Sequence, residues 1–198
     1  LFRFIYENPF EKVKLPKIQR EEMIVLENEQ IKMIIKKLIS DNKNTMADMI
    51  EFTINTGLRG GELINLRNED IKLKVKTITI GNKHYKTKTR RTRIIPLNEV
   101  SLHVLERQSE WQRKKFGKLK EFAFVQDNGK PYLLDTVSGI FKKTIRELGL
   151  PEELHWHCLR HTAASNWVNK KVPIYTVQKL LGHSSVNTTQ IYAKVDLQ

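Results

Sequence analysis

The feature that most constrains the fold is a change of hydrophobic period inside an otherwise helical sequence. Over most of the chain, apolar residues recur at spacings of three and four, which is the pattern of amphipathic helices. From Lys74 to Pro96 the period changes to two, which is typical of short strands joined by turns. We therefore predict a mixed α/β fold that is mostly α-helical and contains a small three-stranded antiparallel sheet.

The three strands are predicted over residues 75–80, 84–88 and 93–95. Gly81-Asn82 supplies the first turn, because glycine and asparagine tolerate the backbone conformations that turns require. Pro96 ends the last strand, because proline lacks the amide hydrogen that a sheet needs. The close spacing of the three runs favours antiparallel pairing through short connections.

Helices are expected before and after this sheet along the chain. Asn28 is expected to cap the first helix, and Gly57 and Gly182 are expected to close two others in the left-handed conformation. The expected helices cover residues 28–39, 46–54, 62–66, 98–116, 135–148, 159–169, 172–181 and 185–193. We expect residues 27–198 to form one domain and residues 1–26, with Asn8-Pro9 and Leu15-Pro16, to be an extended linker.

The distribution of charge points to a polyanionic partner. The 198 residues carry a formal net charge of +13, and no acidic residue lies between Asp70 and Glu99. The cations of that stretch are Lys72, Lys74, Lys76, Lys83, Lys86, Lys88, Arg90, Arg91 and Arg93, and a second group comprises Arg113, Lys114, Lys115, Lys118 and Lys120. Nucleic-acid phosphates are the natural target of such groups, although a solvated basic surface has the same composition. A membrane-surface patch is a weaker interpretation, because the first group alternates like strands.

Several classes of protein fit the sequence poorly. No run approaches the roughly 18 apolar residues of a membrane span, so no membrane partner is expected. Cys158 is the single cysteine, which excludes an internal disulfide and a four-thiolate zinc site and is typical of the reducing cytoplasm. The chain begins at Leu1 without a signal-peptide pattern, and we interpret it as a piece of a longer protein.

Two segments place cations where they can meet a phosphate. Arg59, in Thr56-Gly57-Leu58-Arg59-Gly60-Gly61-Glu62-Leu63, lies between two expected helices, and its planar guanidinium can bind two phosphate oxygens. An ion pair with Glu62 is the alternative, and for this segment alone it is the commoner arrangement. Lys86 and Lys88 share one face of the second expected strand, from which an ammonium can protonate a leaving oxygen. An exposed, solvated hairpin is the simpler interpretation.

The segment His155-Trp156-His157-Cys158-Leu159-Arg160-His161 gathers imidazoles at the start of an expected helix. His157 and Arg160 are three residues apart and project from one side of the first turn. A metal site is not expected, because no glutamate separates the histidines as in zinc hydrolases and no distant ligand pair is evident. His155 and His161 are expected to be packed and hydrogen-bonded.

The last segment connects a helix end to a tyrosine. In Leu180-Leu181-Gly182-His183-Ser184-Ser185, Gly182 stops a helix and His183 lies in the link, and Tyr192 follows nine residues after His183. The helix expected to carry Tyr192 is rich in Thr and Asn, which are poor helix formers, and this is compatible with a mobile element. Taken alone, a tyrosine buried in the core is the ordinary interpretation of Tyr192.

Together and in this order, these segments resemble the catalytic domain of the tyrosine recombinases, also called phage integrases. That family is marked by an arginine in T-G-L-R-x-x-E-L, a hairpin lysine eight residues before a proline, H-x-x-R-H, L-G-H and a tyrosine nine residues later. The matching positions are Arg59, Lys88, His157, Arg160, His183 and Tyr192. Counting back from Pro96 selects Lys88 over Lys86. Trp156 and Cys158 depart mildly from the residues usual beside His157.

The resemblance implies a transient bond between protein and DNA. Tyr192 would attack the scissile phosphate and leave a 3′-phosphotyrosine and a free 5′-hydroxyl. Arg59 and Arg160 would bind the non-bridging oxygens and stabilise the charge of the transition state. Because the energy of the phosphodiester is kept in the protein–DNA bond, neither a metal, nor ATP, nor another cofactor is expected.

The resemblance also assigns the groups that move protons and hold DNA. Lys88 would protonate the departing 5′-oxygen, His157 would help to move the tyrosine proton, and His183 would donate a hydrogen bond to the phosphate. Lys83, Lys86, Arg90, Arg91 and Arg93 are expected to contact the DNA.

Partners and source follow from the same resemblance as expectations. They are double-stranded DNA with specific recombination sites, a homotetramer on that DNA, a possible accessory protein that sets direction, and a mobile genetic element as the source. Residues 1–26 would be the linker from a missing N-terminal core-binding domain. Two alternatives stay open: a type IB topoisomerase, which shares the tyrosine chemistry, and a non-catalytic DNA-binding regulator, which would not need a nucleophile.

Overall fold

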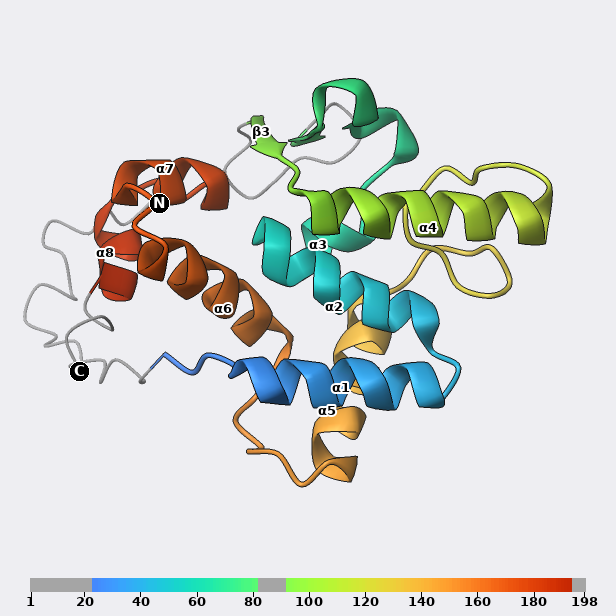
Figure 1. Ribbon diagram of the computed structural model, residues 1–198, viewed down its shortest axis with the longest axis horizontal. Coiled ribbons are helices and arrows are strands. Elements are labelled where there is room, and N and C mark those ends of the chain that lie inside the picture. Colours follow the sequence, from blue (N-terminus) through green and yellow to red (C-terminus); the bar gives the residue numbers. More distant parts are fainter. Residues whose placement is uncertain (1–22, 82–91, 194–198) are drawn as a thin grey trace, which may run out of the picture.

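The computed structural model describes residues 23–81 and 92–193 (Figure 1). Its helices are α1 (Asn28–Ser40), α2 (Asn44–Thr56), α3 (Gly60–Ile64), α4 (Glu99–Phe116), α5 (Leu134–Glu147), α6 (Trp156–Asn169), α7 (Ile174–Leu181) and α8 (Asn187–Ala193). A three-stranded antiparallel sheet lies between α3 and α4 in the chain. The predicted fold class, mostly helical with one small sheet, is therefore confirmed.

The sheet differs from the prediction in which residues form its strands. The strands are β1 (Ile71–Lys72), β2 (Thr77–Ile80) and β3 (Arg93–Pro96), in the order β1-β2-β3. β1 was not predicted, because two residues are too short a run to show a period. Val75 lies in a 3-10 turn rather than a strand, and this turn reverses the chain so that β1 pairs with β2. The predicted strand over 84–88 lies outside the described residues.

Helix α2 is the central element of the domain. It packs against α1, α4 and α6 (Figure 1), and most of its side chains are buried, including Phe52. It ends at Gly57, whose φ of 63° requires the left-handed region that glycine adopts readily. A Cβ atom at Gly57 would lie 2.8 Å from the Trp167 ring of α6, so a larger residue would not fit. The end of α2 is thus held against α6, next to the loop that carries Arg59.

A second, smaller apolar cluster joins α6, α7 and α8. Its buried members are Ala164, Val177, Leu181 and Tyr192. The short helix α8 is therefore anchored by its tyrosine rather than by strong helix formers.

Two details of the ends and surface of the domain complete the fold. The cap of α1 is Glu27, which forms a reciprocal capping box with Gln30, and not Asn28 as predicted. Within residues 23–81 and 92–193, no helix is both long enough and apolar enough to cross a membrane.

Candidate active site

Arg59 lies at the start of α3 and is fixed by the carboxylate one turn later. Its backbone N–H donates to Glu62 Oε2 at 2.9 Å, and its Nη1 donates to Glu62 Oε1 at 3.0 Å and to the Leu181 carbonyl at 3.4 Å. The ion pair considered from the sequence is therefore present. About a third of the Arg59 side chain (34%) is still exposed, so its guanidinium can also meet an incoming anion.

Arg160 projects from the first turns of α6 into the interior. Its side chain is 2% exposed, and it donates to the Gly57 carbonyl at 2.7 Å and to the Leu181 carbonyl at 2.6 Å. The Leu181 carbonyl thus accepts from both Arg59 and Arg160. Burial and then the charge of Arg59 lower the pKa of Arg160 to about 9. A buried guanidinium held by neutral carbonyls is stabilised when an anion approaches.

Glu62 is the carboxylate around which three guanidiniums gather. Arg93 of β3 binds it through both nitrogens, with Nη1–Oε1 at 2.9 Å and Nη2–Oε2 at 2.7 Å, and Arg160 Nη1 lies 4.0 Å away. Burial would raise the pKa of Glu62, but the hydrogen bonds and charges of Arg93 and Arg59 outweigh it and lower that pKa. Three guanidiniums and one carboxylate leave a net charge of +2 in this cluster, as an anion site requires.

Arg93 was expected to contact DNA, and in this structure its guanidinium points into the domain. The Arg93 side chain is 11% exposed, and its Nε donates to the Leu180 carbonyl at 2.9 Å. The physical reason is the buried carboxylate of Glu62, which would be left with too little compensating charge if Arg93 turned outward.

His183 lies in the link between α7 and α8, directly after Gly182. Its Nδ1 is 2.9 Å from the Thr189 hydroxyl, and Thr189 is completely buried. Burial, then the charges of Arg160 and Arg59, lower the pKa of His183 to about 4. The imidazole is therefore neutral at pH 7, and it lies close enough to both arginines for their charges to affect it.

His157 is exposed at the start of α6, and its ring meets that of His161 edge to face, with centroids 4.7 Å apart. Desolvation by the surrounding protein, then His161 and Arg160, lower the pKa of His157 to about 4. His155 is also exposed and contacts the Glu153 carbonyl at 2.8 Å. The prediction that His155 is hydrogen-bonded is confirmed, and its Nδ1 also lies 3.3 Å from the sulfur of the buried Cys158.

Tyr192 is buried, with 1% of its surface exposed, and its hydroxyl lies 2.8 Å from His161 Nδ1. Burial raises the pKa of Tyr192, and the charges of Arg160 and Arg59 oppose this rise. Burial and then Arg160 lower the pKa of His161 to about 4, so a neutral ring faces the phenol. His161 was predicted to be packed and hydrogen-bonded, but nothing in the sequence indicated that its partner is Tyr192, 31 residues away.

The remaining predicted site residues lie outside the described part of the chain. They are Lys83, Lys86, Lys88, Arg90 and Arg91. Across residues 23–81 and 92–193, no group of three or more His, Cys, Asp or Glu side chains is arranged to hold a metal ion.

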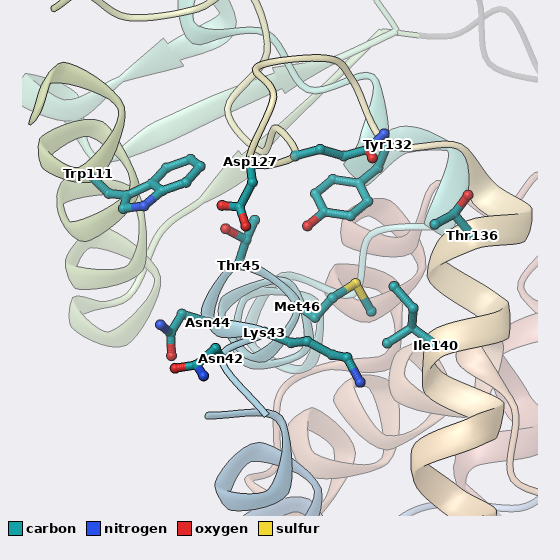
Figure 2. Close-up of a pocket in the computed structure, with 11 residues that line it drawn as sticks. Asn42, Lys43, Asn44, Thr45, Met46, Trp111, Asp127, Tyr132, Thr136 and Ile140 are labelled. Carbon is teal, nitrogen blue, oxygen red and sulfur yellow. The ribbon is translucent and has the colours of Figure 1, made fainter. Parts of the chain in front are cut away.

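A pocket with different residues lies between the α1–α2 turn, α4 and the start of α5 (Figure 2). Trp111, Asp127 and Tyr132 line it, and burial followed by the charge of Asp127 raises the pKa of Tyr132 to about 12. None of the predicted catalytic residues lines this pocket, so the two sites are separate.

The lowered pKa values of the two half-buried histidines predict that the domain loses stability in mild acid. His161 and His183 have pKa values of about 4 in the folded chain and about 6.5 when unfolded, so the unfolded state binds more protons below pH 6.5. The free energy of unfolding should be level above about pH 7 and should fall from pH 6.5 towards 4. A melting curve should show Tm several degrees lower at pH 5 than at pH 7, since about 2–4 °C is lost per kcal/mol in a domain of this size.

The control for this prediction is His161→Phe, which keeps an aromatic side chain but removes one titrating group. Its Tm should depend less steeply on pH between 6.5 and 4.5 than the Tm of the parent chain. Equal Tm values at pH 7 and pH 5 for the parent chain would contradict the prediction.

The sequence matches a known protein family along most of its length. The model of the phage integrase family matches residues 25–198. The chain belongs to the phage integrase family. The chain shares 31% identity over 192 residues with a tyrosine recombinase of Thermosipho africanus, covering 96% of this chain and 64% of that protein. It shares 34% identity over 196 residues with tyrosine recombinase XerC of Caldanaerobacter subterraneus subsp. tengcongensis, covering 98% and 54%.

Solved structures share the fold of this integrase-family chain. An integrase of transposon Tn1549, in complex with transposon right end DNA, is 23% identical with a TM-score of 0.79, covering 98% of this chain and 71% of that one. The XerA recombinase is 25% identical with a TM-score of 0.69, covering 85% and 59%. The chain spans between 54% and 64% of the length of the two curated relatives named above.

Proposed function

We propose that this chain is the catalytic domain of a site-specific DNA recombinase that cleaves and rejoins DNA through a 3′-phosphotyrosine at Tyr192. Family membership supports a recombinase, and one geometric observation carries the finer proposal. Arg59, directly before α3, and Arg160, on α6, donate to the same carbonyl of Leu181. The charges of both arginines also act on His183 and on Tyr192, which supports placing the four groups around one phosphate.

The proposed cleavage step is a substitution at phosphorus. The Tyr192 hydroxyl gives its proton to the neutral His157–His161 pair and its oxygen forms a bond to the phosphorus. The bond to the 5′-oxygen breaks, and the departing oxygen takes a proton from Lys88. Arg59 and Arg160 donate to the non-bridging oxygens, where charge grows in the transition state. In the tautomer required here, the Thr189 hydroxyl donates to Nδ1 of His183, so that Nε2 carries the proton and donates to the phosphate. Rejoining is the reverse reaction with a 5′-hydroxyl as the nucleophile.

The tyrosine proton has a nearer acceptor than the sequence indicated. His157 was expected to help move this proton, but the ring beside the hydroxyl is that of His161, at 2.8 Å, with His157 packed against His161. We propose that neutral His161 accepts the phenol hydrogen bond in the resting protein and that His157 acts one ring further out. Because Tyr192 is 1% exposed, α8 must shift before its oxygen can meet DNA.

The wider function is proposed from the resemblance of the sequence to the family. Lys83, Lys86, Arg90 and Arg91 would hold the phosphate backbone beside Lys88. Residues 1–26 would lead from a core-binding domain, and the protein would act in the cytoplasm as a homotetramer on paired recombination sites of a mobile genetic element. An accessory protein would set the direction of the reaction.

The proposal can be tested with a pool of nicked duplexes of randomised sequence. Cleavage a few nucleotides 5′ of a nick in the same strand releases a short oligonucleotide that carries the free 5′-hydroxyl, so the covalent intermediate accumulates. We expect a protein–DNA adduct that survives denaturation, and the peptide that carries the nucleotide should contain Tyr192. Sequencing of the trapped DNA would give the preferred site.

Other outcomes of this experiment would replace the proposal. An adduct without sequence preference, together with relaxation of any supercoiled plasmid, would identify a type IB topoisomerase. Sequence-specific binding without an adduct would identify a DNA-binding regulator.

A further inference from the structure

We propose that Arg93 is a positioning residue of the candidate active site and not a DNA contact. It lies at the start of β3, the strand that pairs with β2 and lies beside α7 (Figure 1). Its guanidinium points into the domain and makes three hydrogen bonds of 2.7–2.9 Å. This inference rests on the proposed function, because the reaction affected is DNA cleavage. The positioning role itself is argued from the hydrogen bonds of Arg93.

The first step of the argument is the occupancy of the guanidinium. The two Nη atoms bind the two oxygens of Glu62, and Nε binds the Leu180 carbonyl. This is the forked geometry in which arginine recognises a carboxylate, and lysine cannot reproduce it. With 11% of its side chain exposed and Glu62 at 2%, Arg93 could reach DNA only by leaving a buried carboxylate behind.

The second step is what these contacts hold in place. Glu62 also receives the backbone N–H and the guanidinium of Arg59, so Arg93 fixes the acceptor that orients Arg59. Leu180 precedes Leu181, whose carbonyl receives both Arg59 and Arg160. The Arg93 side chain therefore connects β3, α3 and the end of α7. Its partner there, Leu180, is three residues before His183.

The third step is the glycine between α7 and His183. Gly182 has a φ of 68°, and a Cβ atom there would lie 3.1 Å from both Cδ and Nη1 of Arg93. The missing side chain lets the guanidinium pass close to the backbone that leads to His183. The glycine of the L-G-H segment thus closes α7 and also makes room for Arg93.

The test compares Arg93→Lys with Arg146→Lys, since Arg146 is an exposed arginine in the last turn of α5. On the trapping duplex, Arg93→Lys should cleave about 100-fold more slowly at saturating DNA, as expected when catalytic groups are displaced. The slope of log Kd against log salt should be unchanged in Arg93→Gln, which removes the positive charge, because no phosphate contact is lost. Arg146→Lys should match the parent chain in both measurements, and Arg91→Gln, at a proposed phosphate contact, should reduce the slope by about 1.

The opposite pattern would overturn the inference: if Arg93→Lys cleaved at the parental rate and Arg93→Gln reduced the salt slope by about 1, Arg93 would be a DNA contact. If Arg93→Lys failed to fold, Glu62→Gln would decide, because it removes the same ion pair from the other side. A slow cleavage rate with an unchanged slope supports the inference, and a parental rate contradicts it. Absence of an adduct from the parent chain would instead refute the proposed function, and the salt slopes would still test whether Arg93 contacts DNA.

Discussion

Replacing Tyr192 by phenylalanine should abolish the covalent protein–DNA adduct while leaving DNA binding within a few-fold of the parent chain. The substitution removes only the oxygen that would attack phosphorus. The ring stays available to pack with Ala164, Val177 and Leu181, so α8 should keep its place. The lost hydrogen bond to His161 costs about 1 kcal/mol of stability, which the domain should tolerate.

The matched control is Tyr175→Phe, because Tyr175 lies on α7 and 65% of its surface is exposed. This variant should form the adduct as fast as the parent chain. The measurement is the yield of denaturation-resistant adduct on the nicked duplex over time, with binding followed by fluorescence anisotropy. Equal adduct yields from the parent chain and Tyr192→Phe would refute Tyr192 as the nucleophile.

Arg160→Lys should slow cleavage by roughly 100-fold to 1000-fold, which corresponds to about 2.7–4 kcal/mol for the loss of one preorganised donor to the transition state. Lysine keeps the charge, but its single nitrogen cannot bind the Gly57 and Leu181 carbonyls and a phosphate in the arginine geometry. Alanine would be a less specific test, because it would also leave a cavity and remove the Arg160 hydrogen bonds to the Gly57 and Leu181 carbonyls.

Arg160→Lys should be measured as the cleavage rate at saturating DNA, beside Tm and Kd. A Tm close to that of the parent chain with a Kd changed only a few-fold would assign the lost rate to the transition state. A rate within threefold of the parent chain would remove Arg160 from the proposed mechanism.

The sequence allowed those parts of the fold to be predicted that depend on local patterns. Helical periods and closing glycines place α4 to α7 close to their observed bounds, and the period of two locates the sheet. β1 and the Glu27 cap were missed, because a two-residue strand has no period and because a capping box can replace a preferred cap residue.

The site shows the same division between local and distant contacts. The pair of Arg59 and Glu62 was foreseeable because its members are one helical turn apart. The contact of His161 with Tyr192 and that of Arg93 with Glu62 span 31 residues each, and both depend on how separate elements pack. The direction in which Arg93 points depends on the buried carboxylate facing it, and no pattern within β3 encodes that.

The carbonyl of Leu181 has a mechanical consequence. It receives both Arg59 and Arg160, and the side chain of the same residue packs in the cluster that buries Tyr192. A displacement of this one peptide would therefore move Arg59, Arg160 and Tyr192 together. In the proposed mechanism, any contact that shifts the end of α7 would thus affect both phosphate-binding arginines and the nucleophile at once.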